Sequence, residues 1–246
     1  MSNKTVIRVE HATVRYNLSK QRVNNLKDYL IQMAKRQLMF QEFFALQDIN
    51  LQVKEGESWG IVGRNGSGKS TLLKLISGVL KPYQGRVSIN GTIAPLLELG
   101  AGFDDQLTGR ENIFLNGLML GQTKKFLETH FDEIVAFSEL EKFLDVPLKN
   151  FSSGMRSRLG FSIATATRPQ ILIVDEVLSA GDRLFREKCE NRMHEMLSGG
   201  TTLLFVSHSS ESVKELCRNA IWLREGHVVM SGGAEEVCDA YEQNKV

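Results

Sequence analysis

The residues with the clearest chemistry lie in a glycine-rich segment, residues 63–70, with the sequence GRNGSGKS. It fits the pattern G-x-x-x-x-G-K-[ST], in which glycines let successive backbone N–H groups converge on phosphate oxygens. Lys69 would reach the β- and γ-phosphates of a nucleotide, and the Ser70 hydroxyl would bind Mg²⁺. The alternative is a chance glycine-rich turn, but the segment follows an apolar strand and opens a helix whose dipole favours anions. We therefore expect nucleotide binding by Gly63, Asn65, Gly66, Ser67, Gly68, Lys69, Ser70 and Thr71.

Two carboxylates, Asp175 and Glu176, follow a second apolar strand at residues 171–174. In a parallel sheet the carboxyl ends of the strands face the ligand crevice. Asp175 is therefore expected to hold Mg²⁺ through water, and Glu176 to polarise an attacking water. A core strand that merely runs into a charged loop is the alternative, and the phosphate-binding segment upstream disfavours it.

His208 follows a third apolar strand, at residues 201–206. An isolated histidine is more often structural than functional. At the end of a strand in the same sheet, however, it can contact a γ-phosphate. The candidate catalytic residues are thus Lys69, Glu176 and His208.

These side chains need a scaffold of strands that alternate with helices, and the apolar pattern supplies one. Such alternation implies an α/β fold with a parallel sheet covered on both faces. Thr108 and Glu111 have the spacing of a capping box that opens one helix. The other expected helices are 70–77, 124–137, 153–168, 183–197, 209–217 and 234–242; the expected strands are 6–10, 13–16, 49–53, 58–62, 86–89, 92–97, 171–174, 201–206, 221–224 and 227–231.

Composition excludes several classes of protein. Of the 246 residues, 42% are hydrophobic and 24% charged, with a net charge of +1, which excludes a disordered chain, a fibrous repeat and a histone-like polycation. The three cysteines form no CxxC pair and are expected to be buried thiols of a reducing compartment. No signal peptide is evident, and no apolar run approaches the roughly 18–20 residues that cross a bilayer. We expect a cytosolic protein, or one that sits on a membrane from its cytosolic side.

Residues 151–155, with the sequence FSSGM, lie between the phosphate-binding segment and the two carboxylates. Alone, they would be only a helix N-cap. In this order, the motifs resemble those of the nucleotide-binding subunits of ABC transporters, whose signature is LSGGQ or a close variant. The resemblance extends from Tyr16 to about Tyr241. It implies one nucleotide-binding domain over residues 1–246, with a P-loop NTPase (RecA-like) core, an antiparallel β subdomain and an inserted helical subdomain at 99–158.

The resemblance also assigns roles to single residues. It implies that Tyr16 stacks on adenine, although a half-buried strand aromatic is the competing interpretation. It implies that Ser152, Ser153 and Gly154 bind the γ-phosphate of a nucleotide held by a second copy or a paralogue, and that Asp182 lies in the D-loop, which contacts that partner. The chain departs from the family by having Ser153 and Met155 in the signature, and Glu98 where the family has a glutamine that senses Mg²⁺ and the channel.

Four segments narrow the resemblance to exporters of bacterial surface polysaccharides: LLELGAGF, LTGREN, FSSGM and VDEVLSAGD. In those exporters an extra helix near the N-terminus lies against the mouth of the channel, and an insertion at 17–44 fits it. Residues 15–44 carry a net charge of +4, and Leu26, Tyr29, Leu30, Met33 and Ala34 form one apolar helical stripe. A basic amphipathic helix suits a channel or an anionic lipid surface. The alternative is an extra surface helix packed on its own domain.

The expected function is ATP hydrolysis, with Mg²⁺, that drives translocation of a lipid-linked polysaccharide. The expected partners are a second copy of the chain and an integral-membrane permease, with no nucleic acid, and the expected location is the cytoplasmic face of the bacterial inner membrane. Two alternatives stay open. One is an ABC ATPase of a lipid or drug exporter, and the other is a soluble ABC ATPase that acts on ribosomes, DNA or cofactor assembly.

Overall fold

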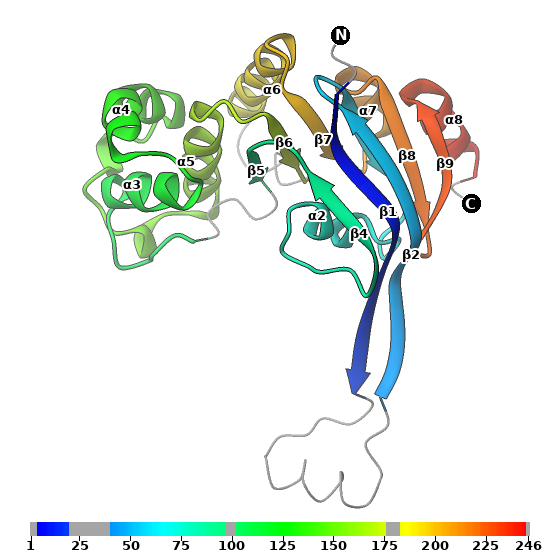
Figure 1. The fold of residues 1–246 in the computed structure, drawn as a ribbon. Helices are drawn as coiled ribbons and strands as arrows, with labels where there is room; N and C mark the ends of the chain where they lie inside the picture. The colour runs from blue at the N-terminus through cyan, green and yellow to red at the C-terminus, as the bar shows by residue number, and fades with distance from the viewer. Residues whose placement is uncertain (1–3, 20–39, 97–101, 176–182, 245–246) are drawn as a thin grey trace, which may run out of the picture.

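The computed structural model describes residues 4–19, 40–96, 102–175 and 183–244 (Figure 1). These residues form two β-sheets, helices that cover the larger sheet, and a group of helices set to one side of it. Among the described helices, none combines the length and the apolar character that crossing a membrane requires.

The larger sheet positions the predicted site. Its six strands have the order β5-β6-β7-β3-β8-β9, and every neighbouring pair runs parallel except β8 and β9. β6 and β7 are buried along their whole length, as their largely apolar sequences require. The predicted parallel sheet of an α/β fold is therefore confirmed. The strands are β3 (Ser58–Val62), β5 (Ile93–Leu96), β6 (Ile171–Val174), β7 (Thr202–Val206), β8 (Asn219–Arg224) and β9 (His227–Gly233).

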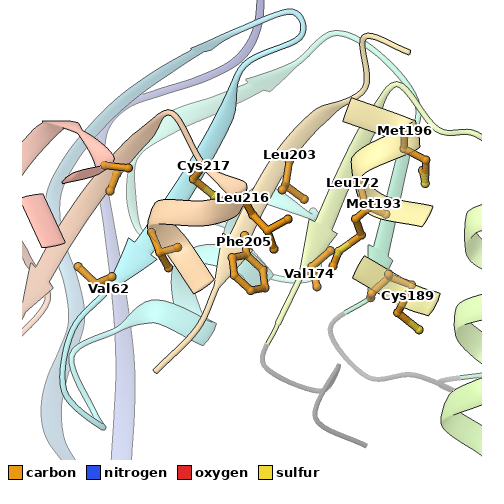
Figure 2. Packing of buried hydrophobic residues seen from close by; sticks show 14 of the residues in the cluster. Val62, Leu172, Val174, Cys189, Met193, Met196, Leu203, Phe205, Leu216 and Cys217 are labelled. Atoms are coloured by element: carbon orange, nitrogen blue, oxygen red, sulfur yellow. The ribbon is translucent and has the colours of Figure 1, made fainter. Parts of the chain in front are cut away.

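Two hydrophobic cores lie on opposite faces of this sheet. Leu172 and Val174 of β6 belong to one core, and Ile171 and Ile173 belong to the other, as the two-residue period of a strand requires. In the first core the strands pack against Cys189, Met193, Met196, Leu216 and Cys217 (Figure 2). The helices that cover the sheet are α2 (Lys69–Ile76), α6 (Arg183–Ser198), α7 (Ser210–Leu216) and α8 (Ala234–Gln243).

The three cysteines are unpaired and buried in the first core, as expected. Burial raises the pKa of Cys189 to about 12 and also raises the pKa of Cys217 and of Cys238, because a thiolate is poorly solvated there. All three thiols are therefore protonated at neutral pH.

The smaller sheet is antiparallel and contains a long hairpin. Its order is β2-β1-β4, with β1 (Thr5–Ser19), β2 (Phe40–Lys54) and β4 (Gln84–Ile89). β1 and β2 have 15 residues each, more than the sequence pattern predicts. Bulges next to His11 and Asp48, which both have positive φ, bend the ladder without ending it.

The hairpin extends into both ends of the insertion expected at 17–44. Pairing of β1 with β2 continues to Ser19 and Phe40, so residues 17–19 and 40–44 are strand (Figure 1). The strand expected at 13–16 is longer in the structure, because hydrogen bonding to β2 extends β1 to Ser19. That cross-strand pairing cannot be read from the sequence alone. The amphipathic helix expected between Leu26 and Ala34 lies outside the described residues.

Three helices form the group beside the sheet: α3 (Gly109–Met119), α4 (Lys124–Ser138) and α5 (Ser153–Ala166), with short turns η1 (Glu141–Phe143) and η2 (Leu148–Asn150). The predicted capping box opens α3. The Glu111 N–H donates to Thr108 Oγ1 at 3.2 Å, and the Thr108 N–H donates to Glu111 Oε2 at 2.8 Å.

Helix α5 crosses the expected end of the helical subdomain at residue 158. Leu159 and Ile163 pack in the core of the helical group, whereas Phe161 and Ala164 pack in the first core of the sheet. Because α5 buries residues on two of its sides, it is part of both the helical group and the layer that covers the larger sheet. The subdomain boundary expected at residue 158 therefore falls inside α5, within the helix expected at 153–168.

Glu139 ties the helical group to α6. It ends α4 in the left-handed conformation, and its two carboxylate oxygens accept from Lys188 Nζ at 3.0 Å and Arg158 Nη1 at 2.8 Å. Lys188 also donates to the Phe137 carbonyl at 2.9 Å. A cation there offsets the negative end of the α4 dipole.

Replacing Glu139 with glutamine is expected to lower the free energy of unfolding by about 0.5–1 kcal/mol at pH 7. The hydrogen bond from Lys188, helped by the charges of Lys188 and Arg158, holds the pKa of Glu139 below its usual value. A carboxylate with a lowered pKa stabilises the fold above its unfolded pKa, and this contribution is lost as the pH falls through its folded pKa. Urea titrations at pH 7 and near pH 3 measure the difference between Glu139→Gln and the parent chain.

Glu128→Gln is the matched control, because Glu128 forms an exposed ion pair with Lys124 on its own helix at 3.7 Å. It should change stability by a few tenths of a kcal/mol at most. A Glu139→Gln deficit of equal size at both pH values would contradict the ionic explanation.

Candidate active site

The segment between β3 and α2 has a backbone that only glycine can follow at two positions. Gly63 has φ +153° and Gly68 has φ +106°. A Cβ at Gly63 would lie 2.3 Å from the Leu223 carbonyl oxygen, and one at Gly68 would lie 2.7 Å from the Ala45 carbonyl oxygen. The loop is therefore held tightly between β8 and β2 at the carboxyl end of β3.

Lys69 is the first residue of α2 and is 6% exposed. Its Nζ donates to the carbonyl oxygens of Gly63 at 2.7 Å and Arg64 at 3.1 Å, so its side chain folds back across the loop. Burial lowers the pKa of Lys69, while the nearby charge of Asp175 opposes that shift. The loop thus holds a partly desolvated cation, which would interact more strongly with phosphate than an exposed lysine does.

Two further features of the loop suit an anion. Ser67 is 4% exposed, and its Oγ has no hydrogen-bond partner within the part of the chain that the structure describes. An unsatisfied buried hydroxyl costs about 1–3 kcal/mol. Helix α2, whose N-cap is Gly68, has no side-chain cap and no acidic residue in its first turn. The Ser67 hydroxyl and the positive end of α2 therefore lie in the same loop, an arrangement that suits a bound nucleotide phosphate.

Ser70 and Asp175 bring oxygen ligands together beside this loop. Asp175 immediately follows β6 and is half-buried, and its carboxylate accepts a hydrogen bond from the Ser70 side chain. Burial raises the pKa of Asp175, and the charge of Lys69 and the Ser70 hydrogen bond act in the opposite direction. A hydroxyl and a carboxylate are hard ligands of the kind that Mg²⁺ takes next to phosphates. The two residues predicted to hold the metal are thus neighbours.

A cavity of about 450 Å³ joins these groups to side chains from other strands. Most of the predicted residues line it, although they come from β1, the β3–α2 loop, the first turn of α2, and the segments that follow β6 and β7. One lining aromatic, Phe43 of β2, was not predicted. The predicted residues among its lining are Tyr16, Asn65, Gly66, Gly68, Lys69, Ser70, Thr71, Asp175 and His208.

Other predicted residues lie elsewhere. Ser152, Ser153 and Gly154 are at the start of α5, where Ser152 Oγ accepts from the Met155 N–H at 3.2 Å, and they do not line the cavity. Gly63 and Ser67 are buried residues of the loop and do not line the cavity. Glu98, Glu176 and Asp182 lie outside the described residues.

Phe43 was missed because it was assigned to the insertion at 17–44. The signal that locates it is strand pairing: Phe43 is the partner of Tyr16 in the β1–β2 register. Sequence alone places the two residues far apart on either side of that insertion.

A family model described as "ABC transporter" matches residues 46–179. The O-antigen export system ATP-binding protein RfbB of Klebsiella pneumoniae is 40% identical over 97% of this chain and 98% of that protein. The teichoic acids export ATP-binding protein TagH of Bacillus anthracis is 43% identical over 96% of this chain, which spans 42% of the length of that protein.

Solved structures share the fold. An ATP-binding subunit of an ABC transporter superposes with a TM-score of 0.76 at 22% identity, covering 97% of this chain and 94% of that one. A dimeric ATP-binding cassette in a post-hydrolysis state, bound to ADP and Pi, gives a TM-score of 0.74 at 22% identity over 93% of this chain and 98% of that one. These likenesses confirm the predicted P-loop α/β fold.

Proposed function

The chain belongs to the ABC transporter family of ATPases, and on that premise we propose that it drives export of a lipid-linked bacterial surface polysaccharide. The ATPase assignment rests on one observation: Lys69, Ser70 and Asp175 all line the same cavity. The polysaccharide part is supported by the names of its relatives, which export O-antigens and teichoic acids.

The geometry suggests how the residues divide the chemistry. Backbone N–H groups of the loop and the start of α2 bind the β- and γ-phosphates, and Lys69 turns from the loop carbonyls to the same phosphates. Ser70 and Asp175 would hold Mg²⁺, which neutralises phosphate charge when bound. His208, exposed after β7, lies at the wall where it can contact the γ-phosphate. Glu176, one residue beyond Asp175, is proposed to position the attacking water.

The resemblance to ABC transporter subunits supports a second copy of the chain as a partner. On that resemblance we assign Ser152, Ser153 and Gly154, which lie off the cavity wall, to the nucleotide of the second copy, with Asp182 near that contact. A homodimer would then bind two nucleotides between its subunits. We further propose an integral-membrane permease as the partner at the cytoplasmic face of the inner membrane, and Glu98 as part of the coupling to it.

Depletion of the chain from its host tests this function. We expect the cells to accumulate lipid-linked polymer inside while surface polysaccharide falls, and the chain to sediment with membranes together with a multi-helix permease. Normal surface polymer after depletion, combined with altered lipid or drug efflux, would instead indicate the other exporter class. A chain that stays in the soluble fraction, bound to ribosomes or DNA, would indicate the non-transport class.

A further inference from the structure

Helix α5 attaches the helical group to the larger sheet, and side chains of α4 and α6 form a second attachment (Figure 1). On α5, Leu159 and Ile163 lie in the core of the helical group, while Phe161 lies in the first core of the sheet. One helix shared in this way would by itself allow the group to turn about the helix axis. Contacts between α4 and α6 oppose such a turn.

Two cations on α6 make this second attachment. Lys188 and Arg192 are four residues apart, so they lie on the same face of the helix. Lys188 Nζ donates to Glu139 Oε1 at 3.0 Å, whereas Arg192 Nη1 and Nη2 both donate to Glu133 Oε1, at 3.1 and 3.0 Å. The two glutamates are about 9 Å apart along α4. Contacts at two separate points fix the direction of α4 relative to α6 as well as its position.

The ring of Phe137 contacts both cations. Lys188 Nζ and Arg192 Cζ each lie 4.8 Å from its centre. The same ring stacks on Phe161 and meets the edge of Phe185, with ring centres 5.8 and 5.9 Å apart. The Arg192 side chain is only 15% exposed, and cation–ring and ionic contacts are stronger away from water. The attachment is therefore packed against the first core, unlike an ordinary surface ion pair.

This attachment also reaches α5 near the start of that helix. Arg158 Nη1 donates to Glu139 Oε2 at 2.8 Å, and the Arg158 guanidinium lies 4.6 Å from the centre of the Phe185 ring. Ser153, the first residue of α5, comes five residues before Arg158, which is about 8 Å along the helix. The orientation of the helical group therefore sets where α5 begins relative to the sheet.

We propose that Lys188 and Arg192 are positioning residues for ATP hydrolysis, because they fix the orientation in which α5 presents Ser152, Ser153 and Gly154. The proposal rests on the proposed function, in which those three residues bind the nucleotide of a second copy. Neither cation lines the nucleotide cavity of its own chain. A shift of about 1 Å in a positioned group can lower a rate about a hundredfold. Loss of one cation should therefore slow hydrolysis without weakening nucleotide binding to the phosphate-binding loop.

The experiment separates turnover from nucleotide binding in the purified full chain. Steady-state hydrolysis of MgATP, at a temperature where every variant is folded, gives kcat, and competition between MgADP and a fluorescent nucleotide analogue gives the affinity of the loop. Lys188→Met should lower kcat about tenfold and keep the MgADP affinity within about twofold of the parent. Arg192→Met should show the same separation. Lys188→Arg should retain kcat, because a guanidinium can still donate to Glu139.

Lys214→Met is the matched control. Lys214 pairs with Asp239 between α7 and α8, and its side chain is 35% exposed, as is that of Lys188. This variant should keep the parental kcat and MgADP affinity. Glu139→Gln should lower kcat, and the double variant with Lys188→Met should be no slower than Lys188→Met alone, because both residues act through one contact.

A parental kcat in Lys188→Met overturns the proposal, as does an equal loss of kcat in Lys214→Met. A fall in MgADP affinity large enough to explain the slower turnover also overturns it, and so do effects that multiply in the double variant. If the parent chain hydrolyses no ATP, the proposed function fails instead.

Discussion

Replacing Lys69 with methionine should reduce ATP hydrolysis by a factor on the order of 10²–10³ or more. The Lys69 charge is buried within the loop, with its Nζ 2.7 Å from the Gly63 carbonyl oxygen, and from there it can turn to the phosphates. Methionine has a similar unbranched shape but no charge, so the developing negative charge on the phosphoryl group loses its nearest cation. Phosphate release by the purified chain under saturating MgATP measures the effect.

The same substitution should not unfold the protein, which separates a chemical role from a structural one. Burial lowers the pKa of Lys69, so the charged amino group lowers the stability of the folded chain. Methionine avoids that cost, and we expect a melting temperature equal to or above that of the parent. Lys54→Met, at an exposed position at the end of β2, is the control and should leave hydrolysis unchanged. Parental hydrolysis by Lys69→Met would remove Lys69 from the mechanism.

Replacing Glu176 with glutamine should leave ATP binding intact and slow hydrolysis by about 10²–10⁴. Glutamine has the shape of glutamate but cannot accept a proton from water. Asp175, the preceding residue in the sequence, lines the cavity and is hydrogen-bonded to Ser70. An ATP-bound dimer should accumulate because the step that resets it is blocked, and size-exclusion chromatography in ATP and in ADP measures it.

Glu187→Gln provides the comparison for this variant. Glu187 lies on α6 and pairs with Arg183 at 3.0 Å on an exposed face. It should leave both hydrolysis and the oligomeric state as in the parent. A Glu176→Gln chain that hydrolyses ATP at the parental rate, or that stays monomeric in ATP, would contradict the assigned role.

Elements with strong apolar runs were predictable. The strand at 171–174 was expected with the bounds of β6, and the helix expected at 183–197 differs from α6 by one residue. Burial on both faces leaves little choice for such segments, because any other conformation exposes apolar surface. The hairpin was less predictable, since bulges at His11 and Asp48 interrupt the alternation that marks a strand.

The local chemistry can be inferred from the amino-acid sequence alone. The spacing of glycine, lysine and serine in residues 63–70 predicts a phosphate-binding loop, because adjacent residues place their backbone and side-chain groups through short-range geometry. Which distant groups join that loop depends on how the chain folds. Asp175 meets Ser70 because β6 and β3 both end at the same edge of one sheet, and Phe43 meets Tyr16 through the register of a hairpin. Such contacts depend on hydrogen bonding between strands far apart in the chain, and no local spacing encodes that register.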